Sequence, residues 1–219
     1  TINQIDKSSS ERYYIALSNK KNKFLLGLAN TDVYEASKYL KIPKLNNKFI
    51  VFDLNFSKNY LERAIIKLSN KNKIFVCATS VHKIKKIKKV LKYIDIIFLN
   101  KAELSQLTNN SIIMNGVKKI IKKNKNIQII ATNSKNNVIY ANNKEIIKIK
   151  PPNIKVKNEN GAGDALAGMM LFLFSKGYSI KNVLKNSVAC GSYYASGKKL
   201  NTKKDLLIIK NLSKKVIIK

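Results

Sequence analysis

Short apolar runs along the chain alternate with longer segments in which apolar residues recur every three or four positions. The runs are rich in Ile, Val and Phe and predict β-strands. They cover Tyr13 to Leu17, Phe24 to Leu28, Phe49 to Asp53, Ile74 to Cys77, Ile94 to Leu99, Ile127 to Thr132, Val138 to Ala141 and Ile146 to Ile149. The periodic segments predict amphipathic helices over Lys58 to Leu68, His82 to Lys92 and Ile112 to Lys123.

From about Phe49 to Thr132 strands and helices alternate, which is typical of right-handed βαβ units and a parallel sheet covered by helices. The first two runs predict an antiparallel hairpin instead, joined by Ser18 to Lys23. The asparagine pairs at 136–137 and 142–143 predict a second meander, because Asn tolerates the left-handed turn conformation.

Beyond Gly161 the pattern is helical. We expect helices over Ala162 to Ser175, Ile180 to Ala195 and Lys204 to Leu212, with stops at Gly177 and Gly197. There is no repeat of solenoid period and no linker long enough to divide the chain. We therefore predict a single domain over residues 1–219.

The composition adds charge to this picture. Lys and Arg together number 43 against 12 Asp and Glu, for a net charge of +31, yet only two are arginines. A selected nucleic-acid site would favour Arg, whose fork fits phosphate and guanine, so coding bias explains the lysines better than a specific polyanion site. Non-specific RNA binding stays open as an alternative.

Length and apolar content, at 219 residues and 45%, suffice for a sizeable core. No apolar run approaches the roughly 18 residues that span a bilayer, so we expect no membrane partner. Cys77 and Cys190 lie in apolar surroundings far apart in sequence. They predict two reduced thiols in a cytoplasmic protein rather than a disulfide.

The stretch Gly161-Ala162-Gly163-Asp164 leads from a polar loop into an apolar helix. Two glycines around Ala162 let backbone amides converge at the helix N-terminus, where free N–H groups and the dipole attract an anion. Asp164, in the first turn, would stay ionised beside that anion and could accept a proton from a hydroxyl. A capped helix with a first-turn acid is the plainer alternative.

Two further motifs follow predicted strands. Asn100 and Glu103 stand at the carboxyl end of the run that closes at Leu99, where ligands bind in open α/β sheets, and an amide with an acid could hold water-bridged Mg²⁺. A helix cap is the alternative there. Asp53 and Asn55 end an earlier strand and by themselves signal a turn.

Together these motifs resemble the PfkB, or ribokinase-like, family of small-molecule kinases, which has a D-x-N element, an N-x-x-E motif and a late G-A-G-D signature in this order. The resemblance implies a three-layer α/β/α fold with a mainly parallel central sheet. It also implies that amides of Gly161, Ala162 and Gly163 neutralise the transferred phosphoryl, that Asp164 is the catalytic base, and that Asn100 and Glu103 organise the metal.

Within this family the sequence is most similar to pseudouridine kinases. The segment from Phe75 to Lys83 is similar to their F-V-D-P-V-S-x-x-K stretch and keeps Ser80 and Lys83. By this resemblance we expect Lys83, together with Asp53 and Asn55, to support the substrate-binding side of the site. The family's nucleotide-side T-x-G-x-x-G is represented by Thr132, with Ser134 and Asn137 replacing its glycines. The family's N-terminal strands and sugar-binding glycine motif have no counterpart, so we expect the chain to be N-terminally truncated.

The resemblance implies a kinase that uses ATP and Mg²⁺, with a monovalent cation as a further candidate, to phosphorylate the 5′-hydroxyl of a nucleoside, pseudouridine first. Thr132 and Ser134 would lie by the nucleotide. Three alternatives stay open: a sugar kinase such as a ribokinase- or fructokinase-like enzyme, a non-catalytic protein that binds RNA non-specifically, and an inactive remnant. A homodimer is a candidate assembly.

Overall fold

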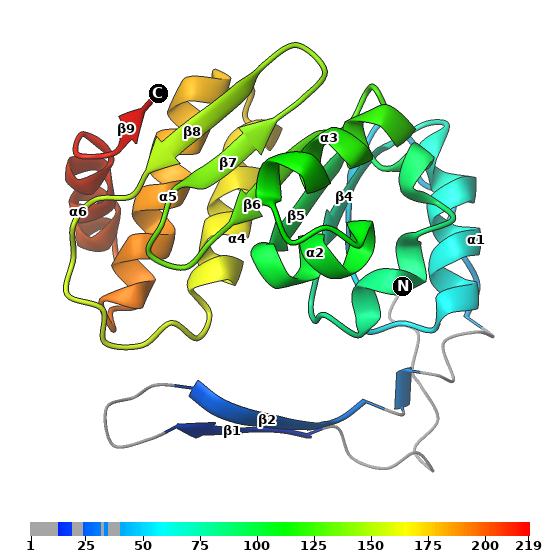
Figure 1. Cartoon of the computed structure of the whole chain (residues 1–219), viewed down its shortest axis with the longest axis horizontal. Coiled ribbons are helices and arrows are strands. Elements are labelled where there is room, and N and C mark those ends of the chain that lie inside the picture. Colours follow the sequence, from blue (N-terminus) through cyan, green and yellow to red (C-terminus); the bar gives the residue numbers. More distant parts are fainter. Residues whose placement is uncertain (1–12, 19–23, 32, 35–39) are drawn as a thin grey trace.

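The computed structural model describes residues 13–18, 24–31, 33–34 and 40–219. Its main body is one seven-stranded sheet in which the strands stand in the same order as in the chain (Figure 1). The strands are β3 (Phe49–Asp53), β4 (Lys73–Cys77), β5 (Ile96–Asn100), β6 (Gln128–Thr132), β7 (Val138–Ala141), β8 (Ile146–Lys150) and β9 (Ile217–Ile218).

The first four strands are parallel to one another, and the last three each run antiparallel to the strand before. Helices connect the parallel strands, as the sequence predicts. The helices are α1 (Lys58–Ser69), α2 (Lys101–Thr108), α3 (Ile113–Lys123), α4 (Ala162–Ser175), α5 (Ile180–Ala195) and α6 (Lys203–Ser213). The predicted ribokinase-like three-layer α/β/α fold is confirmed.

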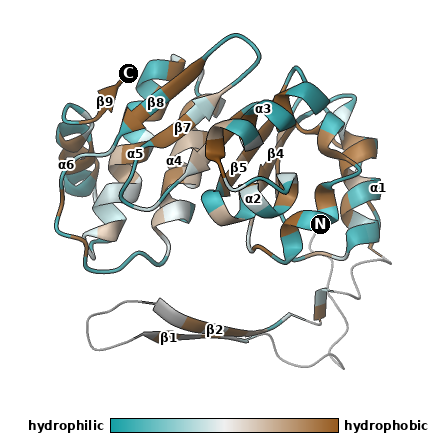
Figure 2. Ribbon diagram, viewed as in Figure 1, coloured by the Kyte–Doolittle hydropathy of each residue, from teal (hydrophilic) through white to brown (hydrophobic). Residues whose placement is uncertain are grey.

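Alternate side chains of each inner strand feed two separate cores. On β4 the side chains of Ile74 and Val76 pack toward α1, whereas Phe75 packs toward α4 and α5. On β5 the same alternation separates Ile97 from Phe98. Strands buried on both faces read as continuous apolar runs, and they form the brown centre of Figure 2 while the lysine-bearing helix faces are teal.

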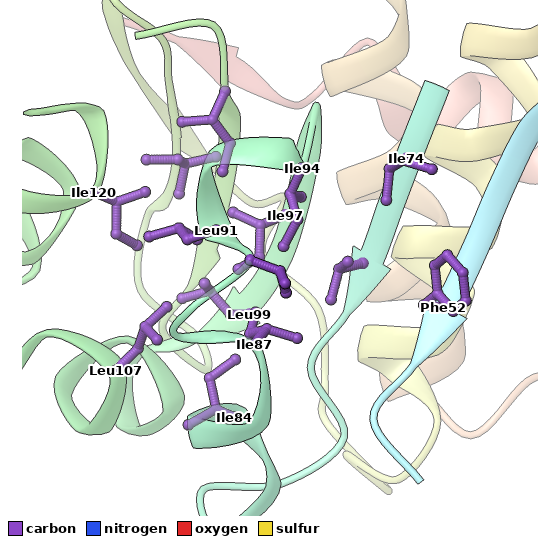
Figure 3. Packing of buried hydrophobic residues seen from close by; sticks show 14 of the residues in the cluster. Phe52, Ile74, Ile84, Ile87, Leu91, Ile94, Ile97, Leu99, Leu107 and Ile120 are labelled. Carbon is purple, nitrogen blue, oxygen red and sulfur yellow. The ribbon is translucent and has the colours of Figure 1, made fainter. Parts of the chain in front are cut away.

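The segment from His82 to Lys92 is not the α-helix that the sequence predicts. It forms two short 3₁₀ segments, η2 (Lys83–Ile87) and η3 (Leu91–Tyr93). Buried Ile84, Ile87 and Val90 repeat every three residues, which is the period of a 3₁₀-helix, in which side chains three apart lie on one line. Figure 3 shows Ile84, Ile87 and Leu91 beside Leu99 and Ile97 of β5.

The N-terminal hairpin is confirmed as an antiparallel pair, β1 (Tyr13–Ser18) and β2 (Phe24–Asn30). It forms a two-stranded sheet of its own, drawn below the main body in Figure 1. Its exposed apolar side chains include Ile15 and Leu28, which are cross-strand partners. Part of the predicted connection, residues 19–23, lies outside the described residues.

The meander of β6, β7 and β8 is also confirmed, but the predicted reason for its turns is wrong. The residue with a left-handed backbone in the first turn is Ser134, with a φ of 48°, rather than Asn136 or Asn137. In the second turn Asn142 acts through its side chain, whose Oδ1 accepts hydrogen bonds from the backbone N–H groups of Lys144 and Glu145. Asn therefore stabilises that turn as a side-chain acceptor.

The C-terminal helices end where the sequence predicts, at Gly177 and Gly197, which have φ values of 73° and 81°. Strand β9 is too short to show a sequence period and was not predicted, yet it completes the sheet beside β8. Among the residues that the structure describes, no helix has the length and apolar content needed to cross a bilayer.

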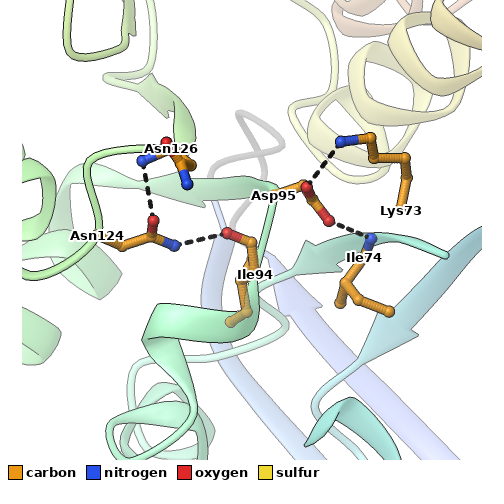
Figure 4. Close-up of polar contacts among 6 residues, drawn as sticks. All are labelled: Lys73, Ile74, Ile94, Asp95, Asn124 and Asn126. Atoms are coloured by element: carbon orange, nitrogen blue, oxygen red, sulfur yellow. Dashed lines mark hydrogen bonds and ion pairs between the residues drawn. The ribbon is translucent and has the colours of Figure 1, made fainter. Parts of the chain in front are cut away.

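The amino end of the sheet is held by polar side chains that come just before strands. The Asp95 carboxylate accepts hydrogen bonds from Ile74 N and Lys73 Nζ, at 2.8 and 3.2 Å (Figure 4). The Asn124 amide donates to the carbonyls of Leu91 and Ile94, at 3.0 and 2.8 Å. These hydrogen bonds join the starts of neighbouring strands, so the polar groups there are paired with other protein groups.

Candidate functional site

A cavity of about 1010 Å³ opens where the carboxyl ends of β5 and β6 meet the first turn of α4. This is the edge of an open α/β sheet at which ligands bind, and the volume suits a small-molecule site. Eight predicted site residues line it: Asn100, Glu103, Thr132, Ser134, Gly161, Ala162, Gly163 and Asp164. The structure therefore brings the nucleotide-side and catalytic candidates together.

The first turn of α4 begins at Gly161, whose φ of 77° is left-handed and favours glycine. The turn into it is set by Asn158, whose side chain accepts a hydrogen bond from Asn160 N at 2.9 Å. The Ala162 amide, which the family resemblance implied would bind the phosphoryl, instead donates to the Glu159 carbonyl at 3.2 Å. The first amides of a helix have no acceptor within the helix, so those of Gly163 and Asp164 offer donors and the positive end of the dipole. The Asp164 carboxylate is exposed beside them.

Sequence reasoning missed Gly191, which fixes where this turn lies. Gly191 is in α5, and a Cβ atom there would come within 3.0 Å of the Ala162 carbonyl oxygen and 3.1 Å of Leu166 Cβ. Only a residue without a side chain lets α5 approach the start of α4 this closely. A lone glycine inside a helical pattern was the available signal.

Lysines on the cavity wall were also missed. Lys101, Lys135 and Lys150 line it, from three different parts of the chain. The surplus of lysine elsewhere hides any local meaning in these three. Together with the amides of α4 they give the cavity cationic groups suited to a polyanionic ligand.

Asn100 and Glu103 form a reciprocal cap at the start of α2. Glu103 N donates to Asn100 Oδ1 at 2.9 Å, and Asn100 N donates to Glu103 Oε2 at 2.8 Å. The Glu103 side chain is only 4% exposed. Burial raises the pKa of its carboxyl, the bond from Asn100 N opposes that rise, and the charge of Asp164 adds to it.

Cys77, the last residue of β4, is a partly buried thiol at the carboxyl edge of the sheet. Burial, and after it the charges of Asp164, Asp53 and Glu103, together raise the pKa of the Cys77 thiol to about 12. Cys77 is therefore a neutral thiol at neutral pH. Asp53 is the register partner of Cys77 in the parallel pair β3 and β4, so both residues end their strands at the same edge of the sheet.

The donor set around Glu103 matches Mg²⁺ only in part. One Glu103 oxygen and the Asn100 side-chain oxygen are already used in the cap, which leaves the second Glu103 oxygen and the exposed Asp164 carboxylate. In the described part of the chain, no three His, Cys, Asp or Glu side chains gather closely enough to hold a metal directly. The residues fit a Mg²⁺ ion held through water and a ligand's phosphates rather than an all-protein cage.

Ser134 lies across the cavity from the start of α4. Its hydroxyl donates to Glu159 Oε1 at 3.1 Å, which joins the β6–β7 turn to the loop before Gly161. Its left-handed backbone, with a φ of 48°, is the conformation that a glycine adopts without cost. The backbone shape expected of a glycine is thus kept although the residue is a serine.

The remaining predicted residues, Asp53, Asn55 and Lys83, do not line the cavity. They form a separate polar cluster at the carboxyl end of β3, where Lys83 Nζ donates to Asn55 Oδ1 at 2.6 Å. Leu54, between Asp53 and Asn55, contacts the cavity wall: its backbone N donates to the hydroxyl oxygen of Thr79 at 3.2 Å.

Comparison with known proteins agrees with this geometry. The profile of the pfkB family carbohydrate kinases matches residues 2–205, nearly the whole chain. The chain belongs to the pfkB family. Membership in this family implies a phosphotransferase that uses ATP and an alcohol acceptor. No curated protein sequence matches the chain.

Solved structures with the pfkB fold are similar over much of the chain. A carbohydrate kinase from Agrobacterium tumefaciens superposes with a TM-score of 0.69 at 22% identity, over 97% of this chain and 72% of that one. Phosphofructokinase-2 from Escherichia coli gives 0.66 at 20%, over 77% and 59%. Adenosine kinase from Trypanosoma brucei brucei gives 0.62 at 16%, over 68% and 52%. At these identities the likeness shows the fold alone.

Proposed function

We propose that the protein transfers the γ-phosphoryl of ATP to the primary hydroxyl of a small molecule, the 5′-hydroxyl of a nucleoside and pseudouridine first. The observation that carries the proposal is the start of α4, where an exposed carboxylate stands beside unpaired helix amides at the mouth of a cavity lined with lysines. An anion cradle next to a base is the arrangement that phosphoryl transfer requires.

In this proposal the Asp164 carboxylate takes the proton of the acceptor hydroxyl, and the oxygen of that hydroxyl attacks the γ-phosphorus. The bond from that phosphorus to the β–γ bridging oxygen breaks, and ADP leaves with the electron pair. Amides of Gly163 and Asp164 hold the charge on the phosphoryl oxygens. Mg²⁺, when bound, would neutralise phosphate charge; the second carboxylate oxygen of Glu103 is the candidate that holds it through water, and Asn100 orients that carboxylate through the cap.

The choice of pseudouridine rests on sequence similarity between residues 75 and 83 and pseudouridine kinases. Two features of the structure support an acceptor near that segment. Lys83 contacts Asn55, and Asp53 pairs with Cys77 at the carboxyl edge of the sheet, the edge at which the cavity opens. The sugar-kinase alternative uses the same base and cradle with a different acceptor.

The experiment is ATP turnover with a panel of acceptors, namely pseudouridine, uridine, ribose, fructose and fructose 6-phosphate. We expect pseudouridine to give the highest kcat/KM. A higher kcat/KM for a sugar would favour the sugar-kinase alternative. No turnover with any of these acceptors would contradict the proposed kinase activity. An inactive remnant or an RNA-binding protein also predicts no thermal stabilisation by ATP with Mg²⁺.

Replacement of the proposed base gives the first quantitative prediction. Asp164→Asn should lower kcat by roughly 10²- to 10⁴-fold, because a positioned general base contributes that much, and should leave the melting temperature nearly unchanged because the side chain is exposed. Glu145→Gln, an exposed acid in the β7–β8 turn, is the matched control. A rate within threefold of wild type for Asp164→Asn would exclude it as the base.

We also propose that residues 1–219 belong to one kinase domain, as the single main sheet supports. The two free thiols, Cys77 and Cys190, support a reducing, cytoplasmic setting. A monovalent cation as an additional cofactor and a homodimer stay predictions from the amino-acid sequence.

A further inference from the structure

The polar cluster beyond β3 is built so that Lys83 holds the side chain of Asn55. Asp53 accepts hydrogen bonds from both the backbone N and the Nδ2 of Asn55, each at 2.9 Å, which fixes the direction of the amide. Its oxygen then faces Lys83 Nζ at 2.6 Å. A charged donor on an oriented amide is a strong hydrogen bond.

Lys83 is itself held in place. Its backbone N donates to the hydroxyl oxygen of Ser80 at 3.2 Å, at the start of η2. One 3₁₀ turn later, Lys86 Nζ donates to the carbonyl oxygens of Phe56 and Asn55, at 2.7 and 3.4 Å. The loop from β3 to α1 is therefore gripped by two lysines from η2, and of these Lys83 reaches the side chain that faces Asp53.

The same ammonium group reaches the N-terminal hairpin. Lys83 Nζ lies 3.5 Å from the hydroxyl of Thr31, the first residue after β2. Close by, the rings of Tyr34 and Phe56 meet edge to face with centroids 5.7 Å apart. A two-stranded sheet is marginally stable alone. We therefore expect the contacts of Thr31 and Tyr34, which follow β2, to help hold β1 and β2 in position.

We propose that Lys83 is a positioning residue that couples the β1–β2 sheet to the acceptor side of the site, by joining Thr31 to Asn55 and thereby to Asp53. The expected effect of Lys83 on acceptor turnover rests on the proposed kinase function. It assigns Lys83 no contact with the reacting atoms. Loss of the ammonium removes the contact to the Thr31 hydroxyl and the contact to the Asn55 side-chain oxygen at once, while the bonds from Asn55 to Asp53 remain.

Steady-state kinetics give the first test. Lys83→Met should raise the KM for the acceptor about 10- to 100-fold, the range expected for loss of a charge-assisted hydrogen bond. The KM for ATP should stay within about twofold, because Lys83 does not line the nucleotide cavity. Lys83→Arg should restore much of the loss. Lys85→Met, an exposed lysine of the same 3₁₀ segment, controls for the removed charge.

Hydrogen exchange gives a second test that needs no turnover. In Lys83→Met the amides of β1 and β2 should exchange faster than in wild type, whereas those of β5 and β6 should not. Thr31→Val should have the same effect, and the double variant should add little, because both remove one link. Unchanged exchange in β1 and β2, or an equal rise in both KM values, would overturn the proposal.

The two tests separate this proposal from the proposed function. A protein without kinase activity under any condition contradicts the function, and hydrogen exchange alone then decides whether Lys83 couples the two parts. An active protein in which Lys83→Met matches wild type in acceptor KM contradicts the coupling and leaves the function intact.

Discussion

The two ends of the sheet differ in how their polar groups are used. At the amino end, Asn72, Asp95 and Asn124 each stand just before a strand and bond to two or more backbone groups or side chains of neighbouring segments. At the carboxyl end, the strands finish in Asp53, Cys77, Asn100 and Thr132, and a cavity opens beside the last two of these residues.

This difference separates stability from chemistry. Polar groups at the amino end face other protein groups and join the strands to one another, so removing one costs folding free energy. At the carboxyl end, Asp164 and the first amides of α4 face a cavity, and like charges are brought together at some cost to folding. Variants at one end should therefore change melting behaviour, and variants at the other should change turnover.

The largest stability effect is expected at Asn124. Asn124→Ala removes two buried hydrogen bonds to the carbonyls of Leu91 and Ile94 and the part-buried acceptor for Asn126 N. We expect a loss of about 2–4 kcal/mol in the free energy of unfolding, measured in urea, with kcat unchanged. Asn126→Ala, whose side chain is exposed, is the control and should change stability by less than about 0.5 kcal/mol. A stable Asn124→Ala with impaired turnover would reverse the comparison.

A glycine pair tests how the cavity end is shaped. Gly191→Ala places a Cβ atom against the Ala162 carbonyl and Leu166, and should cost about 1–2 kcal/mol of stability while raising the KM for ATP, because the start of α4 must shift. Gly168→Ala, where a Cβ atom meets nothing within 4 Å, should instead stabilise α4 by up to about 1 kcal/mol. The same chemical change thus gives opposite signs. If Gly191→Ala and Gly168→Ala changed the KM for ATP equally, close packing between α4 and α5 would not be the cause of the change.

The smallest effect concerns Glu103 and appears only as a pH dependence. Because burial raises its pKa above the reference value of 4.5, the folded protein holds this proton more tightly than the unfolded chain. The stability from this group is complete below about pH 4.5 and is lost as the pH rises through the folded-state pKa. Relative to wild type, Glu103→Gln should therefore gain stability as the pH rises.

Urea unfolding at several pH values between 4 and 8 measures this difference. The Gln side chain can still accept the bond from Asn100 N, so the cap survives the replacement. Glu145→Gln, with an exposed carboxyl, should show no such trend. If the difference in free energy of unfolding between Glu103→Gln and wild type did not widen with pH, the raised pKa of Glu103 would be contradicted.

Much of the fold could be predicted because strands buried on both faces leave continuous apolar runs, such as Ile74 to Cys77. The segment at Ile84 and Ile87 was predicted as an α-helix because spacings of three and four both suggest one. The continuation at Val90 shows the period of three. Strand β9 has only two residues, too few for any period.

The site was predicted through short motifs, and their limits are physical. Gly161 to Asp164 lies at a helix start because glycine permits the left-handed turn there. Whether Asn100 and Glu103 cap a helix or hold a metal could not be decided from spacing, since both roles need the same residues three apart. Gly191 depends on packing between α4 and α5, and Thr31 with Lys83 on a contact between distant segments, which no local pattern records.

The sequential strand order of the main sheet has a consequence for how the protein is made. Each strand from β4 to β8 pairs with the one synthesised just before it and follows it closely in the chain, whereas β9 joins β8 only after α4, α5 and α6. Such a sheet can grow strand by strand as the chain leaves the ribosome. The wall containing Asn100 is then built well before α4 and α5 bring Asp164 to it, so the cavity closes late in synthesis, after most of its floor is in place.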